Sequence, residues 1–323
     1  MTQGGTVRYH VPVMVDEVVE ALLEGPEGPL VDGTAGGGGH IAALDEAARG
    51  QRPLIGVDRD PDALARCSQR FSKRPHVVVV RGNFGDLPRA LAKGGFEEPN
   101  SIAGILLDLG VSSWQLDHGP RGFAFRFEDA PLDMRMDATD DGTRTARQLL
   151  EELTEDALCD VLRGYGEVKH ARAVAKRIKQ AVSAGQMTTT GDLVAAVGGR
   201  RVKGRAHPAT TVFQALRIAV NRELEALDAA LSIAPRLLKP GGRLAVIAYH
   251  SLEDRRVKRT FKLGEAGPPR PGHLPPPSDW TQTWRRVTRK ALVPSAKEIA
   301  LNPRARSAKM RVAAFVHGRE AHA

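Results

Sequence analysis

The stretch Pro29-Leu30-Val31-Asp32-Gly33-Thr34-Ala35-Gly36-Gly37-Gly38-Gly39-His40 decides how the rest of the sequence is interpreted. The apolar pair Leu30-Val31 predicts a short buried strand, and the glycine cluster leads into a predicted helix over Ile41–Arg49. Strand, glycine turn and helix form the opening of a nucleotide-binding α/β unit. Glycine suits such a turn because a Cβ would hold the backbone away from a ligand, and because some turn positions need a positive φ.

Two classes of ligand fit this unit. Residues Gly37–Ala42 formally match G-x-G-x-x-A, the fingerprint of dinucleotide-binding proteins, although four consecutive glycines satisfy many patterns. Residues Val31–Gly36 look more like the first motif of S-adenosylmethionine (SAM) methyltransferases. A second predicted strand, Leu54–Val57, is followed by Asp58, about 20 residues after the glycines, where an acid commonly binds a ribose diol. The choice between the two ligands therefore depends on the rest of the chain.

Further apolar runs predict a parallel, doubly wound sheet. Val77–Val80 is a continuous β-branched run, typical of a strand buried on both faces, and Ile102–Leu107 is the next such run. Because strands alternate with helices, ligands are expected at the carboxyl ends of the strands. The residues predicted at those ends are Asp32, Asp58, Phe84 and Asp108.

The alternation of strands and helices stops after Asp108 and returns near the end of the chain. Gly110–Asp141 is loop-like, and only helices are predicted from Thr145 to Gly198. A turn at Lys239–Gly242, followed by late antiparallel strands, is typical of SAM methyltransferases and not of dinucleotide dehydrogenases. The remaining predicted segments are a helix over 168–182, a basic linker over 198–208, a long helix over 213–231, a proline-rich connection over 268–277, and strands over 243–249, 283–290 and 308–316.

These segments predict an α/β fold, a Rossmann-like SAM-dependent methyltransferase sheet with an inserted all-helical domain. Residues 1–115 and 213–323 are expected to form the methyltransferase domain, which is discontinuous in sequence. Residues 116–212 are expected to form the helical insert, which would recognise the substrate.

Charge and cysteine content narrow the function. The chain of 323 residues has a net charge of +9, and residues 255–311 hold fifteen Lys and Arg against three Asp and Glu, so this segment alone carries +12. Such a concentration favours docking to a polyanion. The two cysteines, Cys67 and Cys159, form no C-x-x-C pattern, so no metal site is expected. No signal peptide or membrane-spanning run is seen, so we expect a cytoplasmic protein and no membrane partner.

Several longer motifs resemble one family. They are His10–Met14, Gly38–His40, Asp108–Ser113, Pro131–Asp137, Tyr165–Ala171, His207–Thr210, Phe213–Ile218, His250–Arg255 and Asn302–Ala308. Together they resemble the ribosomal RNA small subunit methyltransferase H family, also called MraW, over nearly the whole chain. The resemblance implies a SAM-dependent enzyme that methylates the N4 amine of a cytosine in the decoding centre of bacterial 16S rRNA. Its partners would be 16S rRNA and the small ribosomal subunit.

The resemblance also implies which residues bind SAM. Gly38, Gly39 and His40 match the turn that meets the methionine end, Asp58 matches the ribose-binding acid, and Phe84 matches a contact beside the adenine. The family's remaining contacts fall on Asp108 and Gln115, and the resemblance alone points to Gln115.

The chain departs from the family pattern at three places. Trp114 stands where proline is expected, Thr211-Val212 replace Arg-Thr, and Ala248-Tyr249 replace Ser-Phe. None of these departures falls on a residue assigned to SAM. The change at Thr211-Val212 removes a possible RNA contact.

The chemistry of N4 methylation calls for a group that accepts a proton. The cytosine amine is a poor nucleophile because its lone pair is delocalised into the ring, so a hydrogen-bond acceptor at the N–H would help. Ser112, Asp133 and His250 are candidates for this catalytic role. Methylation at pyrimidine C5 normally uses a cysteine nucleophile, and neither cysteine is predicted near a strand end. Two other functions stay open at this point, namely a non-catalytic RNA-binding ribosome assembly factor and an NAD-dependent oxidoreductase.

Overall fold

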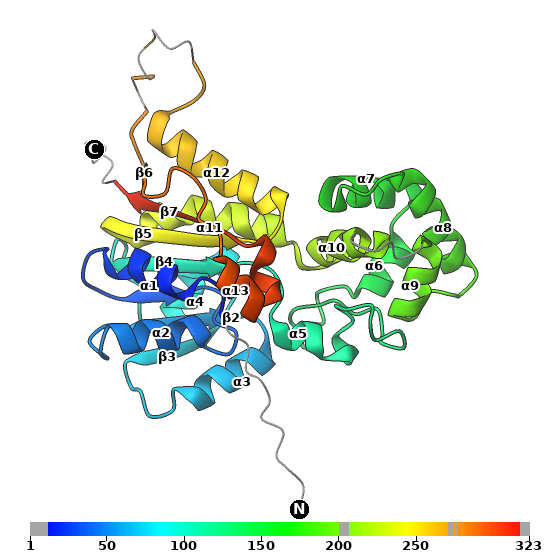
Figure 1. Ribbon diagram of the computed structural model, residues 1–323, viewed down its shortest axis with the longest axis horizontal. Coiled ribbons are helices and arrows are strands. Elements are labelled where there is room, and N and C mark those ends of the chain that lie inside the picture. Colours follow the sequence, from blue (N-terminus) through cyan, green and yellow to red (C-terminus); the bar gives the residue numbers. More distant parts are fainter. Residues whose placement is uncertain (1–11, 200–206, 271–273, 275–276, 279, 317–323) are drawn as a thin grey trace, which may run out of the picture. The chain divides into compact units, whose positions relative to one another are not determined.

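The computed structural model describes residues 12–199, 207–270, 274, 277–278 and 280–316, and it divides the chain into two compact units (Figure 1). The first, here called the α/β unit, comprises Met1–Gly110 and Glu225–Ala323, and the second, the helical unit, comprises Val111–Leu224. The insert predicted at 116–212 lies inside the helical unit. His10, Val11 and parts of the predicted segments 198–208 and 268–277 lie outside the described residues.

Within the described residues, the α/β unit is built on a seven-stranded sheet with the order β3-β2-β1-β4-β5-β7-β6. Strands β1 to β5 pair in parallel, whereas β7 runs antiparallel to both β5 and β6. The chain moves outward from β1 to β3 and then returns to β4, so the order reverses between β1 and β4. The bounds are β1 Leu30–Asp32, β2 Leu54–Asp58, β3 Val77–Arg81, β4 Ile102–Asp108, β5 Leu238–Ala248, β6 Trp284–Arg286 and β7 Lys309–Phe315.

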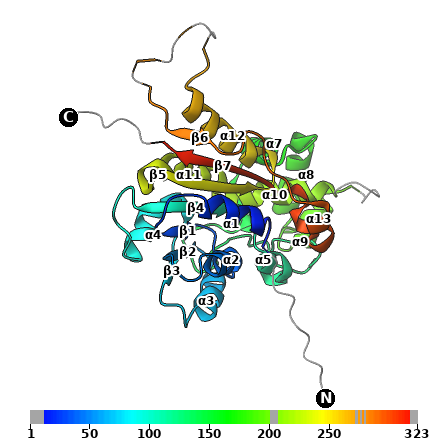
Figure 2. The same cartoon turned by 60° about the vertical axis from the view of Figure 1, so that its left-hand side comes forward.

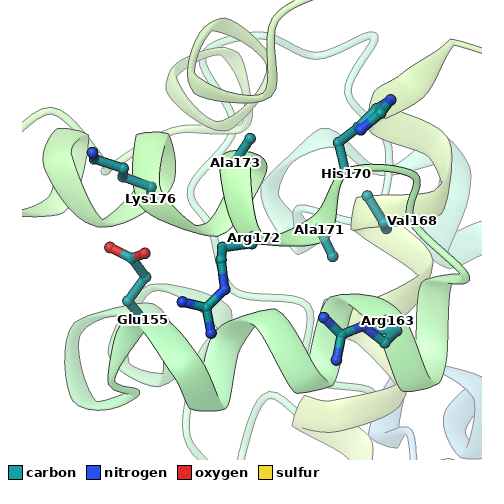
Figure 3. Close-up of a pocket in the computed structure, with 8 residues that line it drawn as sticks. All are labelled: Glu155, Arg163, Val168, His170, Ala171, Arg172, Ala173 and Lys176. Carbon is teal, nitrogen blue, oxygen red and sulfur yellow. The ribbon is translucent and has the colours of Figure 1, made fainter.

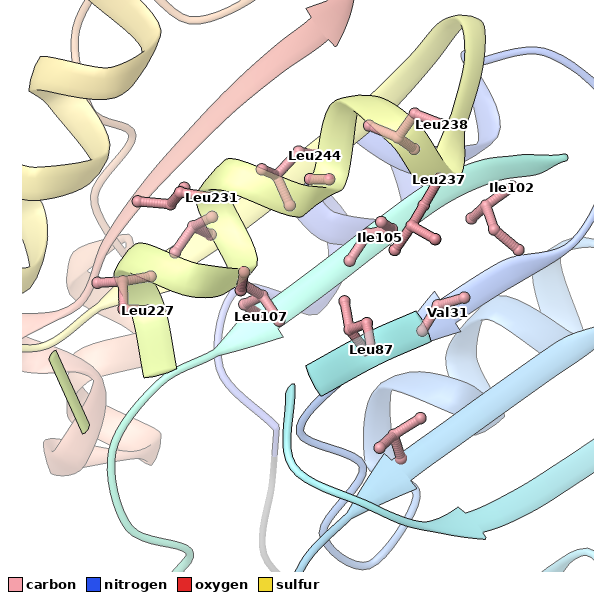
Figure 4. Close-up of a cluster of buried hydrophobic side chains, with 14 of the residues drawn as sticks. Val31, Leu87, Ile102, Ile105, Leu107, Leu227, Leu231, Leu237, Leu238 and Leu244 are labelled. Carbon is pink, nitrogen blue, oxygen red and sulfur yellow. The ribbon is translucent and has the colours of Figure 1, made fainter. Parts of the chain in front are cut away.

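Helices cover both faces of this sheet, because side chains alternate between two buried clusters along each strand. Leu30 and Leu106 belong to the cluster that packs under α1, α2 and α3. Val31 and Ile105, their neighbours in sequence, belong to the cluster under α4, α11 and α12 (Figure 4). Figure 2 shows α12 beside β6 and β7. The helices are α1 Val15–Leu23, α2 Gly39–Ala47, α3 Pro61–Arg70, α4 Leu87–Lys93, α11 Glu223–Leu237, α12 Ser251–Ala266 and α13 Ala296–Leu301.

The predicted α/β class and its doubly wound sheet are therefore confirmed. The order reversal between β1 and β4 matters for function, because ligands of such sheets bind where the strand order reverses, outside the carboxyl ends of the strands. Asp32, Asp58 and Asp108 are the last residues of β1, β2 and β4.

The helical unit packs around a core of its own. Leu150, Leu158, Leu162 and Ile178 are fully buried in it. Val212, one of the departures from the family pattern, is also fully buried there, which explains an apolar residue at that position. Its helices are α5 Ser113–Asp117, α6 Ala146–Glu152, α7 Glu155–Gly166, α8 Ala171–Ser183, α9 Thr190–Val197 and α10 Pro208–Asn221.

The prediction of one long helix over 213–231 is wrong, because α10 ends at Asn221 and α11 begins at Glu223. Arg222 between them is left-handed, with φ 50°. The buried Asn221 side chain donates to the Met134 carbonyl (2.7 Å) and accepts from the Met136 N–H (2.8 Å). These bonds to a distant loop hold the end of α10. The apolar spacing continues across Arg222, so the sequence pattern gives no sign of the break between the two helices.

Other predicted bounds shift by a few residues. Helix α8 begins at Ala171 and not at residue 168, since Glu167 and His170 both have positive φ. The predicted strand over 283–290 is reduced to β6, whereas β5 already begins at Leu238, upstream of the predicted turn. Element ends are the least determined part of a sequence pattern.

Candidate functional site

The glycine turn between β1 and α2 has one packed side and one open side. Gly38 has φ 73°, and a Cβ there would lie 2.5 Å from Cε2 of the buried Phe71 ring. A Cβ on Gly37 would meet no atom of the residues that the structure describes within 4 Å. Position 38 therefore requires glycine for the fold, whereas position 37 leaves space over the turn.

Asp58 at the end of β2 is tied to this turn. Its Oδ2 accepts from the Gly36 N–H (2.8 Å), and its Oδ1 accepts from the Asp60 N–H (2.9 Å). Burial raises the pKa of Asp58 to about 6, against the opposing effect of these two backbone hydrogen bonds. Each carboxylate oxygen can accept more than one hydrogen bond, so the group suits a ligand with two adjacent hydroxyls.

A chain of hydrogen bonds joins the ends of β1 and β4. The Asp108 N–H donates to Thr34 Oγ1 (2.7 Å), and the Thr34 N–H and hydroxyl both donate to Asp32 Oδ1 (3.0 and 3.2 Å). The other oxygen, Asp32 Oδ2, is buried and has no hydrogen-bond partner among the described residues. Burial raises the pKa of both Asp32 and Asp108. An unpartnered buried acceptor is costly, and a cationic or N–H-bearing ligand would satisfy it.

His40, in the first turn of α2, lies between Asp108 and the N-terminal segment. Its Nε2 is 2.9 Å from the Val13 carbonyl oxygen. Since a carbonyl oxygen can only accept, Nε2 carries the proton of this bond. The other ring nitrogen, Nδ1, lies 3.9 Å from Asp108 Oδ2. Pro12 packs over the turn as well, because a Cβ on Gly39 would lie 3.1 Å from its ring.

Phe84 follows β3 and begins a short 3-10 helix over Phe84–Asp86. A Cβ added to Gly33 would lie 3.3 Å from the Cβ of Phe84, which places Phe84 beside the glycine turn. The α/β unit thus collects Gly38, Gly39, His40, Asp58, Phe84 and Asp108 along the carboxyl edge of its parallel strands.

Gln115, Ser112 and Asp133 belong to the helical unit and have local partners there. Ser112 Oγ accepts from the Gln115 N–H (3.2 Å), and Gln115 Oε1 accepts from the Ser112 N–H (3.0 Å). This capping box begins α5 with Trp114 inside the helix. Asp133 forms a bidentate ion pair with Arg135 (2.9 and 3.0 Å). These bonds give the three side chains fixed orientations within the helical unit.

His250 lies in the α/β unit, directly before α12. Its side chain is 9% exposed, and Nε2 lies 3.1 Å from Oε1 of the buried Glu253. The other oxygen, Glu253 Oε2, accepts from the Tyr249 N–H (2.8 Å). The imidazole therefore lies beside a carboxylate at the same sheet edge as Asp108.

Tyr249 is a residue at this edge that the sequence reasoning missed. It follows β5, and its hydroxyl donates to Asp108 Oδ1 (2.8 Å). The strand-end rule that selected Asp32, Asp58 and Asp108 applies equally to the end of β5, and would have found it.

Both cysteines lie in apolar cores. Cys67 is fully buried in α3 behind the turn, and burial raises the pKa of its thiol to about 12. Cys159 is buried in the core of the helical unit. A buried, inaccessible thiol cannot attack a pyrimidine ring. This geometry supports methylation at an amine over methylation at C5.

Two basic surfaces stand out. On α12, the exposed Arg255, Lys258, Arg259 and Lys262 have the spacing of one helical face. In the helical unit, α7 and α8 border a hollow of about 670 Å³ (Figure 3). It is lined by Glu155, Arg163, Val168, His170, Ala171, Arg172, Ala173 and Lys176.

The charges at the sheet edge discriminate between the two candidate ligands. Carboxylates end three neighbouring strands, β2, β1 and β4, and His40 is the imidazole among them. SAM carries a positive sulfonium and an ammonium group, which these carboxylates attract. The pyrophosphate of NAD would be repelled by the same groups.

A sequence profile of the MraW methylase family matches residues 8–316. The chain belongs to this family. Ribosomal RNA small subunit methyltransferase H from Sorangium cellulosum is 45% identical over 97% of this chain and 92% of its own length. The protein of the same name from Heliobacterium mobile is 44% identical, covering 94% of this chain and 98% of its own. A solved rRNA methylase from Streptococcus thermophilus aligns over 94% of each chain, with 13% identity and a TM-score of 0.38.

Membership in the MraW methylase family confirms the predicted enzyme class and its cofactor, SAM. The alternatives of an NAD-dependent oxidoreductase and a non-catalytic assembly factor are set aside. In the part of the chain that the structure describes, no helix is long and apolar enough to span a bilayer. That part also holds no cluster of three or more His, Cys, Asp and Glu side chains arranged to bind a metal ion.

Proposed function

We propose that this member of the MraW methylase family methylates the N4 amine of a specific cytosine in the decoding centre of bacterial 16S rRNA. The observation that carries the proposal is the match over residues 8–316, which includes every residue of the strand-end site. Relatives that are 44–45% identical over nearly the whole chain are named ribosomal RNA small subunit methyltransferase H. The buried cysteines and the carboxylates at the strand ends agree with this chemistry.

Under this proposal the strand-end residues bind SAM. Gly38, Gly39 and His40 hold the methionine end, and Asp58 accepts hydrogen bonds from the ribose hydroxyls. Phe84 would contact the adenine. Asp108 and Gln115 are the remaining two residues that we assign to SAM. Bound SAM supplies an activated methyl group on a positive sulfur atom.

The chain's own contribution is orientation and proton acceptance. Holding donor and acceptor in line is worth on the order of 7–11 kcal/mol without any metal. A carboxylate or imidazole that accepts the amine proton localises the nitrogen lone pair as the bond forms. Among Ser112, Asp133 and His250, we favour His250, because its ring lies beside Glu253 at the sheet edge that carries Asp108. Asp133 already accepts two hydrogen bonds from Arg135, so its carboxylate is occupied.

RNA docking follows from the basic surfaces of the two units. The stripe on α12 begins one turn after His250, so phosphate contacts along it would lead the substrate strand toward the sheet edge. Exposed Arg285, Arg289 and Lys290 add to this charge, whereas Arg286 is paired with Glu265 (2.5 Å). In the helical unit, Arg172 and Arg163 have acidic neighbours at 2.8 and 3.6 Å, exposed pairs weak enough to exchange for phosphate.

Transfer of labelled methyl groups tests the function. Small ribosomal subunits that lack the modification are incubated with the enzyme and SAM labelled in its methyl group, and the digested RNA is analysed by nucleoside chromatography. We expect the label in N4-methylcytidine, and no incorporation into subunits that are already modified. Label in 5-methylcytidine would refute the assignment of the amine, and RNA binding without incorporation would favour an assembly factor.

A further inference from the structure

The hydroxyl of Tyr249 contacts the carboxylate of Asp108, one of the residues assigned to SAM. It directly follows β5, and its hydroxyl donates to Asp108 Oδ1 over 2.8 Å. The two residues are 141 positions apart in the sequence. Phenylalanine is the residue expected here from the family pattern, so the hydroxyl is an addition to a ring that the fold already accommodates.

We propose that Tyr249 is a positioning residue that fixes the orientation of the Asp108 carboxylate for SAM. The inference rests on the proposed function, because that function assigns Asp108 to SAM. It concerns the phenol hydroxyl alone and not the aromatic ring.

Three elements hold Asp108. Its backbone N–H donates to Thr34 in the glycine turn (2.7 Å), which fixes the main chain at the end of β4. Its Oδ1 is bound by Tyr249, and its Oδ2 lies 3.9 Å from His40 Nδ1 on α2. The terminal torsion of an aspartate is broad, so a backbone bond alone does not set the direction of the carboxylate. The phenol sets it, because it engages one oxygen and thereby leaves the other toward His40.

The same bond affects the charge of Asp108. Burial raises the pKa of Asp108 and Glu253 on α12 raises it further, whereas His40 and the hydrogen bond from Tyr249 lower it. The carboxylate of Asp32 at the end of β1 also interacts electrostatically with the carboxylate of Asp108. A donor to the ionised carboxylate favours the ionised form. Loss of the hydroxyl is therefore expected to raise the pKa of Asp108.

Tyr249 itself stays a donor throughout. Burial, with the neighbouring Asp108 carboxylate as the next contribution, raises the pKa of the phenol. The hydroxyl is consequently protonated wherever the enzyme is folded and active. Its ring is in van der Waals range of Gly110, where a Cβ would lie 3.7 Å from Tyr249 Cδ2. Phenylalanine preserves this packing, so the Tyr249→Phe variant separates the hydroxyl from the ring.

The experiment measures SAM affinity by isothermal titration calorimetry from pH 5 to pH 9 for wild type and Tyr249→Phe. We expect affinity to fall about 10- to 150-fold at neutral pH, the range for a hydrogen bond to a charged group. We also expect the acid limb of the affinity profile to move to higher pH, since Asp108 then loses its charge earlier. Tyr165→Phe in the helical unit is the matched control, with affinity and profile unchanged.

A merely structural role would weaken binding equally at every pH and leave the acid limb in place, and that result overturns the proposal, as does an unchanged affinity. The Asp108→Asn variant tests the assignment of Asp108 to SAM separately from the positioning role of Tyr249. If Asp108→Asn binds SAM as wild type does, the assignment of Asp108 to SAM fails and the proposal fails with it. If Asp108→Asn weakens binding but Tyr249→Phe does not, only the positioning role is refuted. In the Asp108→Asn background, Tyr249→Phe is expected to add nothing.

Discussion

The Asp58 carboxylate offers the sharpest test of the proposed cofactor site, through the substitution Asp58→Asn. The carboxylate already accepts from the Gly36 and Asp60 N–H groups, and the proposed ribose hydroxyls would add donors to the same two oxygens. Asparagine has nearly the same shape but only one acceptor oxygen and no charge. Hydrogen bonds from the ribose to a charged acceptor are lost, and we expect a cost of about 1–3 kcal/mol.

This cost corresponds to a Kd for SAM that rises about 5- to 150-fold at pH 8, at about 1.4 kcal/mol per factor of ten. Burial raises the pKa of Asp58 to about 6, so the wild-type carboxylate gains a proton as the pH falls through that value. The ratio of the Kd of Asp58→Asn to that of wild type should then shrink as the pH falls below 6, by up to about tenfold per pH unit, until it approaches one. The Kd of wild type for SAM therefore approaches that of the variant at acid pH, and the two Kd values differ most at alkaline pH.

Isothermal titration calorimetry of both proteins between pH 5 and pH 8 measures this ratio directly. The raised pKa values of Asp32 and Asp108 also influence binding, but they are shared by both proteins and cancel in the ratio. Asp62→Asn, an exposed acid in the first turn of α3, serves as the matched control and should bind SAM as wild type does. A Kd ratio near one at pH 8, or a large ratio that does not change with pH, would refute the assignment of Asp58 to the ribose.

The remaining predictions concern the glycine turn and the basic surface. Gly38→Ala is expected to lower the stability of the fold by about 1–3 kcal/mol, because position 38 has φ 73° and its Cβ would clash with Phe71. Gly37→Ala should leave the melting temperature unchanged but weaken SAM binding, since its Cβ points into the open space over the turn; equal melting temperatures for both variants would contradict this account. Replacing three exposed cations near β6 with alanine should flatten the log–log salt dependence of RNA binding by up to about three units while SAM affinity stays the same. A matched triple at the β3 side of the sheet should leave the salt slope unchanged, and equal slopes for the two triples would refute docking at β6. The first triple is Arg285, Arg289 and Lys290, and the control triple is Lys73, Arg89 and Lys93.

Much of the α/β unit was predictable because its signals are local. Continuous apolar runs such as Val77–Val80 and Ile102–Leu107 mark buried strands, and the glycines after Val31 mark the turn. A parallel sheet brings the carboxyl ends of its strands to one edge, so the sequence alone predicts that Asp32, Asp58 and Asp108 lie close to one another. This rule depends only on strand direction and chain order.

The capping box of α5 could also have been found in the sequence. Ser112 followed three residues later by Gln115 is its signature, and the structure contains the reciprocal bonds. The resemblance to the family assigns Gln115 to SAM, and the chemistry of proton acceptance makes Ser112 a catalytic candidate. Where two roles compete for one side chain, the local pattern alone does not choose between them.

Tertiary structure decided the features that join distant parts of the chain. Nothing in the pattern around Phe213–Leu231 shows that Asn221 bonds to a loop 85 and 87 residues away and ends α10 there. The pairing of Arg286 with Glu265, which removes one cation from the basic surface, depends on β6 lying beside α12. The bond from Tyr249 to Asp108 spans 141 residues. Apolar periodicity and turn chemistry act over a few residues and therefore appear in the sequence, whereas the partner of a buried polar group is set by which strands and helices the folded core brings together.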